Sequence, residues 1–205
     1  MSTKKALILS ANDFEDTELL VPYYRLLEAG FTVDVASDKG SPIRGKHGYE
    51  VPVSKVFNEL SQDQYSTYDL LLLPGGKAPA AIRNNQRVQE ITRYFMNEKK
   101  PVAAICHGPQ ILISSGVIRG RNATCYKTVV TELREAAAQY QDTEVIVDGN
   151  LVTSREPRDL PAFCREIMNL LGEQGQQFQQ GQQLQQGQQS QQGQQQKDEQ
   201  QWHKY

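Results

Sequence analysis

Short apolar runs rich in Val, Ile and Leu alternate along the chain with longer amphipathic stretches. Turn-forming residues bound each run, which is typical of strands buried on both faces of a sheet. The predicted strands cover Ala6–Ser10, Phe31–Ala36, Asp69–Leu73, Pro101–Ile105, Glu144–Val147 and Leu151–Thr153. The predicted helices cover Glu15–Ala29, Arg87–Lys99, Pro109–Ser115, Thr131–Ala138 and Pro157–Leu171.

This alternation predicts an α/β domain with a doubly wound, mostly parallel sheet between two layers of helices. In such a domain the functional site lies beyond the carboxyl ends of the strands. The glycine spacing from Gly40 to Val53 predicts a hairpin after the second strand. Neither a Walker A sequence nor GxGxxG occurs, so nucleotide hydrolysis and dinucleotide binding lack their usual support.

The composition changes after Gly172. From Gly175 to Gly193 the sequence repeats two glutamines and one other residue, with too few apolar side chains to form a core. We therefore predict an α/β domain over residues 1–172 and a disordered Gln/Gly-rich tail over residues 173–205. The alternative for the tail is association through glutamine ladders or an isolated partner helix.

Composition and charge narrow the function classes. The 205 residues include 22 Lys and Arg and 24 Asp and Glu, for a net charge of −2, without a basic block. Nothing indicates nucleic acid or a membrane as a partner, and with no signal-peptide pattern we expect a soluble, cytoplasmic protein. The three cysteines are widely spaced and form no Cys/His cluster, so no disulfide framework, metal site or cofactor is expected.

The strongest local signal is the predicted strand-to-helix turn at Cys106. Small residues precede it, and Gly108 and Pro109 follow it. A tight turn of this kind, a nucleophile elbow, holds the side chain at the start of the next helix, where the thiol should ionise more easily than a free one. The alternative is a buried cysteine at a strand end. Cys164 is predicted to be a core residue and Cys125 a passive thiol.

Other polar and glycine-rich positions fall at the same edge of the predicted sheet. His107 is a candidate general acid or base, or it packs the elbow and offers only its backbone N–H. Gly75 and Gly76 could form an oxyanion hole with that N–H, or a simple tight turn. The loop after the first strand carries four acidic residues, and their spacing does not choose between a site acid and a solvated helix start: Asp13, Glu15, Asp16 and Glu18.

Together these motifs resemble the ThiJ/PfpI superfamily of class I glutamine amidotransferase-like proteins, and within it the PfpI-type intracellular proteases, or general stress proteins. The Cys-His-Gly-Pro-Gln elbow and the Phe-Glu-Asp loop are its most specific parts. The matching segments cover most of residues 4–171 in order: Ala11–Leu19, Gly45–Gly48, Leu72–Gly76, Ala104–Leu112 and Val147–Arg155.

The resemblance implies a flavodoxin-like domain that assembles as a homodimer or as a ring of dimers. It also implies the roles of five residues: Cys106 as nucleophile, Glu15 as the buried acid contacting its sulfur, His107 as catalytic partner, Gly76 at the oxyanion and Tyr126 near the pocket. In the protease type an acid of the neighbouring subunit orients the histidine. Ala80 takes the place of that acid here, which disfavours a peptidase triad.

The function predicted from the sequence is that of a cysteine-dependent hydrolase or lyase. Its substrate would be a small reactive carbonyl such as methylglyoxal or an adduct of one, as in a deglycase or glyoxalase, or a peptide. The alternative is a non-catalytic stress protein, either a redox sensor through Cys106 or a holdase-like chaperone.

Overall fold

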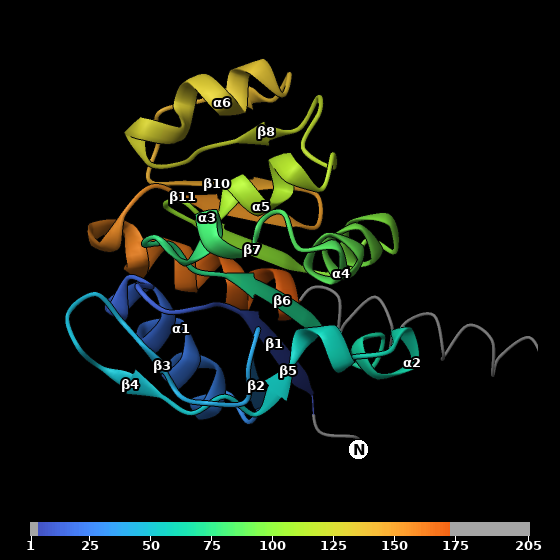
Figure 1. The fold of residues 1–205 in the computed structure, drawn as a ribbon. Coiled ribbons are helices and arrows are strands. Elements are labelled where there is room, and N and C mark those ends of the chain that lie inside the picture. Colours follow the sequence, from blue (N-terminus) through green and yellow to red (C-terminus); the bar gives the residue numbers. More distant parts are fainter. Residues whose placement is uncertain (1–3, 173–205) are drawn as a thin grey trace, which may run out of the picture. The chain divides into compact units, whose positions relative to one another are not determined.

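Seven strands pair into one mostly parallel sheet in this computed structural model, which describes residues 4–172 (Figure 1). The strand order across the sheet is β10-β11-β7-β6-β1-β2-β5, and only β10 runs antiparallel to its neighbour. The strands are β1 (Lys5–Leu9), β2 (Thr32–Ser37), β5 (Lys55–Val56), β6 (Leu70–Leu73), β7 (Val102–Ile105), β10 (Val145–Asp148) and β11 (Leu151–Ser154). The predicted doubly wound α/β class is confirmed.

The centre of the sheet is apolar on both faces. Every residue of β6 and β7 is fully buried, and β1 is buried from Ala6 onward. The parallel register aligns Ile8 with Leu72 and Leu72 with Ala103, so the three central strands end at the same level. Helices on both faces exclude water, which is why these strands read as continuous apolar runs rather than alternating ones.

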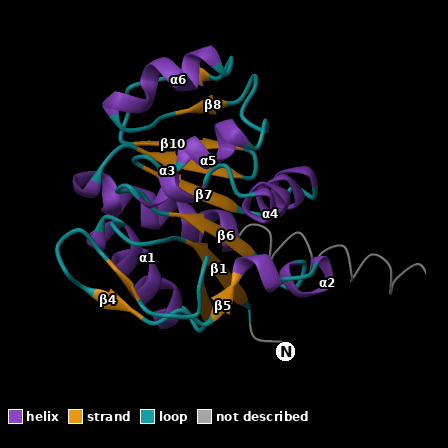
Figure 2. Ribbon diagram, in the orientation of Figure 1, coloured by secondary structure: helices purple, strands orange, loops and turns teal. Residues whose placement is uncertain are grey.

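Helices flank the sheet, as Figure 2 shows. On one face α5 contacts α3, α4 and α6. On the other face lie α1 and the helix that begins at residue 160, where the Arg25 charge acts on the Cys164 thiol. The bounds are α1 (Asp16–Glu28), α2 (Gln62–Tyr65), α3 (Ala78–Ile82), α4 (Gln86–Asn97), α5 (Pro109–Ser114) and α6 (Val130–Glu135), with 3-10 turns at Phe57–Glu59, Lys127–Val129 and Pro157–Asp159.

The smaller elements differ most from the sequence predictions. The predicted hairpin is present as β3 (Ile43–Arg44) and β4 (Glu50–Val51). The sequence did not predict α2, α3, β5, or the pair β8 (Asn122–Ala123) and β9 (Gln139–Tyr140). These segments are two to five residues long, and so short a segment carries no periodicity by which it could be recognised.

The chain divides into two units, residues 1–168 and residues 169–205. In the second unit the structure describes residues 169–172, which are helical. The disordered tail predicted for residues 173–205 lies outside the described residues. Cys125 and Cys164 are both buried, as predicted for Cys164. Within residues 4–172, no helix is long and apolar enough to cross a membrane.

Candidate active site

The carboxyl ends of four parallel strands bring the candidate residues together. The loops after β1, β6, β7 and β11 all leave the sheet at this edge. Backbone hydrogen bonds join the first two loops, from Glu15 N–H to the Gly75 carbonyl (3.2 Å) and from Lys77 N–H to the Asp13 carbonyl (2.8 Å). The loop after β7 carries Cys106.

Cys106 sits at a sharp turn directly after β7. Its φ of 63° lies in the left-handed region, which a non-glycine residue occupies only where the surroundings hold it there. The Cys106 N–H donates to the Ser154 carbonyl (3.1 Å), and the Tyr126 N–H donates to the Cys106 carbonyl (2.9 Å). A Cβ on Gly108 would lie 2.1 Å from the Leu73 carbonyl oxygen, so only glycine fits after this turn. The geometry is that of the predicted nucleophile elbow.

His107 reaches the sulfur although it follows Cys106 directly. Its Nδ1 lies 3.2 Å from Cys106 Sγ, and its Nε2 lies 3.1 Å from Thr128 Oγ1. The Tyr126 ring packs against the imidazole with 5.2 Å between ring centres. Burial and the Lys46 charge both lower the pKa of His107, so the imidazole is neutral at pH 7. A neutral imidazole in this position can take the thiol proton.

The acid beside the sulfur is Glu18, and the assignment of Glu15 to that place is wrong. Glu18 is fully buried within the first turn of α1. Its carboxyl lies beside the Cys106 thiol, and each group shifts the pKa of the other. Oε2 accepts the Gly75 N–H at 3.0 Å, while Oε1 has no hydrogen-bond partner among the described residues. Glu15 is the residue before the helix, and its carboxyl pairs with Lys46 of the β3–β4 hairpin.

Glu15 belongs to a neighbouring cluster. It is 7% exposed and forms an ion pair with Lys46, while His47 Nε2 lies 3.5 Å from its other oxygen. Both partners come from the β3–β4 hairpin, which Asp16 ties to α1 by accepting the N–H groups of His47 (2.9 Å) and Tyr49 (3.0 Å). Glu15 therefore holds the hairpin beside the site.

Burial dominates the electrostatics of the Glu18–Cys106 pair. Burial, helped by the negative charge of Glu15, raises the pKa of Glu18 to about 8. Burial and the charge of Glu18 raise the pKa of the Cys106 thiol, so the expectation that the elbow alone lowers this pKa is wrong. The backbone N–H groups of Gly76 and His107 lower the pKa of this thiol. Because Glu18 retains its proton up to about pH 8, its charge opposes the thiolate only above that pH.

The two glycines of the predicted oxyanion hole have different partners. The Gly75 N–H is already donated to Glu18, so it is not free for a substrate oxygen as predicted. The N–H groups of Gly76 and His107 point to the sulfur, where they stabilise negative charge. A new oxyanion bonded to a carbon on that sulfur would form close to both donors.

Replacing Gly75 by alanine should disrupt the site. The added Cβ would lie 2.3 Å from Glu18 Oε2 and 2.6 Å from Cys106 Cβ, both held in a packed interior. We expect a loss of stability of about 1–3 kcal/mol from this overpacking and a fall in turnover of at least tenfold. The matched control is Gly40→Ala, whose Cβ would make only ordinary contact with Val56 Cγ2 at 3.8 Å. Thermal unfolding and kinetics of both variants test this, and equal behaviour of the two would contradict the packing seen at Gly75.

Sequence reasoning missed Lys46 and Thr128 and weighed Glu18 without choosing it. Glu18 lies four residues before the buried Pro22, on the stripe that also contains Leu19 and Leu26. A charged residue on a buried stripe was the available signal. No signal in the sequence pointed to Thr128, because its approach to His107 depends on the turn at Lys127–Val129.

Residues 4–172 contain no cluster of three or more His, Cys, Asp or Glu side chains that could hold a metal ion. The described residues bring together the Cys106 sulfur, the His107 imidazole, the Glu18 carboxyl and backbone N–H groups. Their arrangement is suited to nucleophilic addition at a carbonyl carbon.

Proteins of known families are similar to this chain over most of its length. Residues 4–170 match the DJ-1/PfpI family. The chain is 50% identical over 167 residues to Deglycase PfpI of Pyrococcus furiosus, covering 82% of this chain and 99% of that protein. It is 43% identical over 173 residues to Protein/nucleic acid deglycase 2 of Escherichia coli, covering 83% and 99%.

A solved structure shares the fold. It is a two-domain protein of Anabaena variabilis with DJ-1/ThiJ/PfpI-like and ferritin-like domains, and it superposes with a TM-score of 0.79 at 37% identity. The match covers 82% of this chain and 48% of that protein, about half of its length.

Proposed function

Because the chain belongs to the DJ-1/PfpI family, we propose that it is a cysteine-dependent deglycase or glyoxalase-like enzyme that removes reactive carbonyls and their adducts. The observation that carries the proposal is the contact of one sulfur with both a neutral imidazole and a buried carboxyl. Relatives that are 50% and 43% identical are deglycases by name, which favours the same class of substrate for this chain.

The first step is addition of the thiol to the aldehyde carbon of a 2-oxoaldehyde such as methylglyoxal. Sγ bonds to the carbon, the thiol proton passes to His107 Nδ1 at 3.2 Å, and the carbonyl electron pair moves to oxygen. That oxygen takes the proton back from His107 and becomes the hydroxyl of a thiohemiacetal. An adduct in which an amine occupies the same carbon gives the same species when sulfur replaces the amine, which leaves with a proton.

Glu18 supplies the second step. The thiohemiacetal carbon bears a hydrogen beside a ketone, and this hydrogen is acidic. In its ionised form Glu18 removes this hydrogen as a proton to give an enediolate and then returns it to the neighbouring carbon. The hydroxyl proton of the first carbon passes to the former ketone oxygen, which leaves a 2-hydroxy thioester. A carboxylate with a pKa near 8 is a stronger base than an ordinary glutamate. Water then cleaves the thioester to a 2-hydroxy acid and the free thiol.

The partner of His107 disfavours peptide cleavage. Its Nε2 is held by the neutral hydroxyl of Thr128, and Ala80 stands where an orienting acid is expected. Without a carboxylate the imidazolium is less stabilised, and expulsion of an amide nitrogen needs that imidazolium more than aldehyde addition does. The homodimer or ring of dimers stays a prediction. Exposed Val21, Tyr24 and Leu27 on α1 support it, and the mass of the protein in solution tests it.

The test is product analysis with the purified protein. We expect methylglyoxal to be converted to lactate, and methylglyoxal-treated N-acetylarginine and N-acetylcysteine to yield lactate together with the unmodified amino acid. Fluorogenic peptides should be turned over at least tenfold more slowly. Peptide cleavage without lactate would favour the protease class. Oxidation of Cys106 by peroxide with no turnover of any substrate would favour the redox sensor.

A further inference from the structure

A pocket lies beside Tyr126, whose ring packs on His107. It has a volume of about 290 Å³, close to the lower limit for small-molecule sites of roughly 300 Å³. Tyr126 lines it and also packs on His107, so the pocket and the catalytic residues share one wall. Its lining residues come from the end of β9 and from the loops after β8, β9 and β11: Cys125, Tyr126, Lys127, Tyr140, Asp142, Arg155, Glu156 and Arg158.

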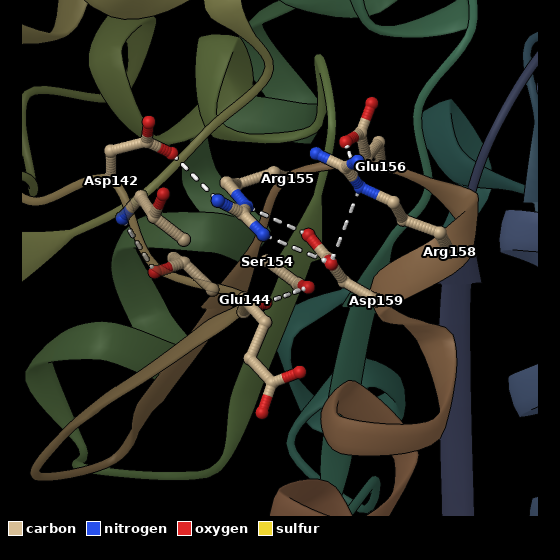
Figure 3. Close-up of polar contacts among 9 residues, drawn as sticks. Asp142, Glu144, Ser154, Arg155, Glu156, Arg158 and Asp159 are labelled. Carbon is tan, nitrogen blue, oxygen red and sulfur yellow. Dashed lines mark hydrogen bonds and ion pairs between the residues drawn. The ribbon is translucent and has the colours of Figure 1, made fainter.

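One wall of the pocket is a fixed network of charges, which Figure 3 shows. Arg155 lies between two carboxylates, with Nη1 2.7 Å from Asp142 and with Nε and Nη2 at 2.8 and 3.1 Å from the two oxygens of Asp159. Arg158 forms an ion pair with Glu156. Because these arginines already have carboxylate partners, they shape the pocket and offer little free charge to a ligand.

Lys127 is the exception among the cations that line the pocket. It is exposed, and within residues 4–172 its only recorded interaction places Nζ 5.9 Å from the centre of the Tyr126 ring. No carboxylate of the described residues forms an ion pair with it. The pocket therefore presents one ammonium group without a counter-ion beside the aromatic side chain that packs on the catalytic histidine.

We propose that this pocket binds an oxyanion, a carboxylate or a phosphate, on the molecule that carries the carbonyl adduct. The proposal rests on the deglycase function proposed above. The adduct carbon would lie at Cys106, the carrier would extend past Tyr126, and its anionic group would pair with Lys127. An adduct on a carrier without a negative charge would lack this contact with Lys127. Lys127 is thus a specificity-determining residue for charged carriers.

The experiment compares pairs of adducts that differ in one charged group. The carboxylate pair is the hemithioacetal of methylglyoxal with N-acetylcysteine and with N-acetylcysteine amide. The phosphate pair is methylglyoxal-treated guanosine monophosphate and methylglyoxal-treated guanosine. KM and kcat are measured for the wild type, Lys127→Ala, Lys127→Arg and the control Lys39→Ala, which removes an exposed lysine outside the pocket lining.

For the wild type we expect a KM about three- to fivefold lower for the charged member of at least one pair, the range expected for an exposed ion pair. Lys127→Ala should remove this preference with kcat unchanged, Lys127→Arg should keep it, and Lys39→Ala should behave as the wild type. The pair that shows the preference identifies the oxyanion. The preference should also weaken with added salt.

The experiment distinguishes a failure of the proposed subsite from a failure of the proposed deglycase function. If the adducts are turned over and KM is the same for charged and neutral members of both pairs, or if Lys127→Ala keeps the preference, the subsite is overturned and the deglycase function stands. If no adduct is turned over, both are overturned.

Discussion

Replacing Cys106 by serine should lower kcat/KM for methylglyoxal by about a thousandfold or more, the loss typical of removing a nucleophile. The serine hydroxyl is a far weaker nucleophile at neutral pH, and the neutral His107 cannot compensate for it. The exchange is nearly isosteric, so the turn with φ of 63° should be kept. Steady-state kinetics, together with circular dichroism to show that the fold is intact, provide the measurement.

The matched controls are the other two cysteines. Cys125 and Cys164 are buried like Cys106, but no described contact joins either of them to His107 or Glu18. Cys125→Ala and Cys164→Ala should therefore retain activity within about threefold once they are folded. Full activity in Cys106→Ser would exclude the sulfur at the elbow as the nucleophile.

The second large effect is expected at Glu18. Glu18→Gln keeps the size of the side chain and its contact with the Gly75 N–H, but it can no longer move a proton between the substrate carbons. We expect kcat for methylglyoxal to fall by about a hundredfold to ten-thousandfold, the usual contribution of general acid–base catalysis. The rate of Cys106 alkylation should remain measurable, since the sulfur and His107 are still present.

Glu15→Gln is the matched control on the same helix start. It weakens the ion pair with Lys46 and so loosens the hairpin, but it leaves the Glu18 carboxyl in place beside the thiol. We expect a loss of no more than about tenfold. If Glu15→Gln were the more damaging of the two, the carboxyl seen beside the sulfur would not be the one that moves the proton.

The main strands could be predicted because each is a long apolar run between turn residues. The four leucines of β6 and the Val-Ala-Ala-Ile run of β7 are too apolar to form exposed segments. The two-residue strands β5, β8 and β9 exist because neighbouring segments pair with them. Their sequences alone do not specify that pairing, since strand formation depends on context.

The sequence predicted the parts of the site whose positions depend on the course of the backbone alone. Cys106 and His107 come together because a tight turn follows a buried strand, and the sequence shows both the strand and the turn. The choice between Glu15 and Glu18 depends on where α1 begins, and helix boundaries are uncertain by one or two residues. That difference decides which carboxyl faces the sulfur. The raised pKa values follow from burial, which only the packed structure reveals.

The central claim is that Glu18 is a buried, proton-carrying partner of Cys106. Its most direct test is the titration of the carboxyl carbon of Glu18 by NMR in 13C-labelled protein, with the resonance assigned by its loss in Glu18→Gln. The structure predicts a midpoint of about 8. A midpoint near the ordinary glutamate value of 4.5 would contradict it, because burial beside Cys106 would then not hold a proton on Glu18 at neutral pH.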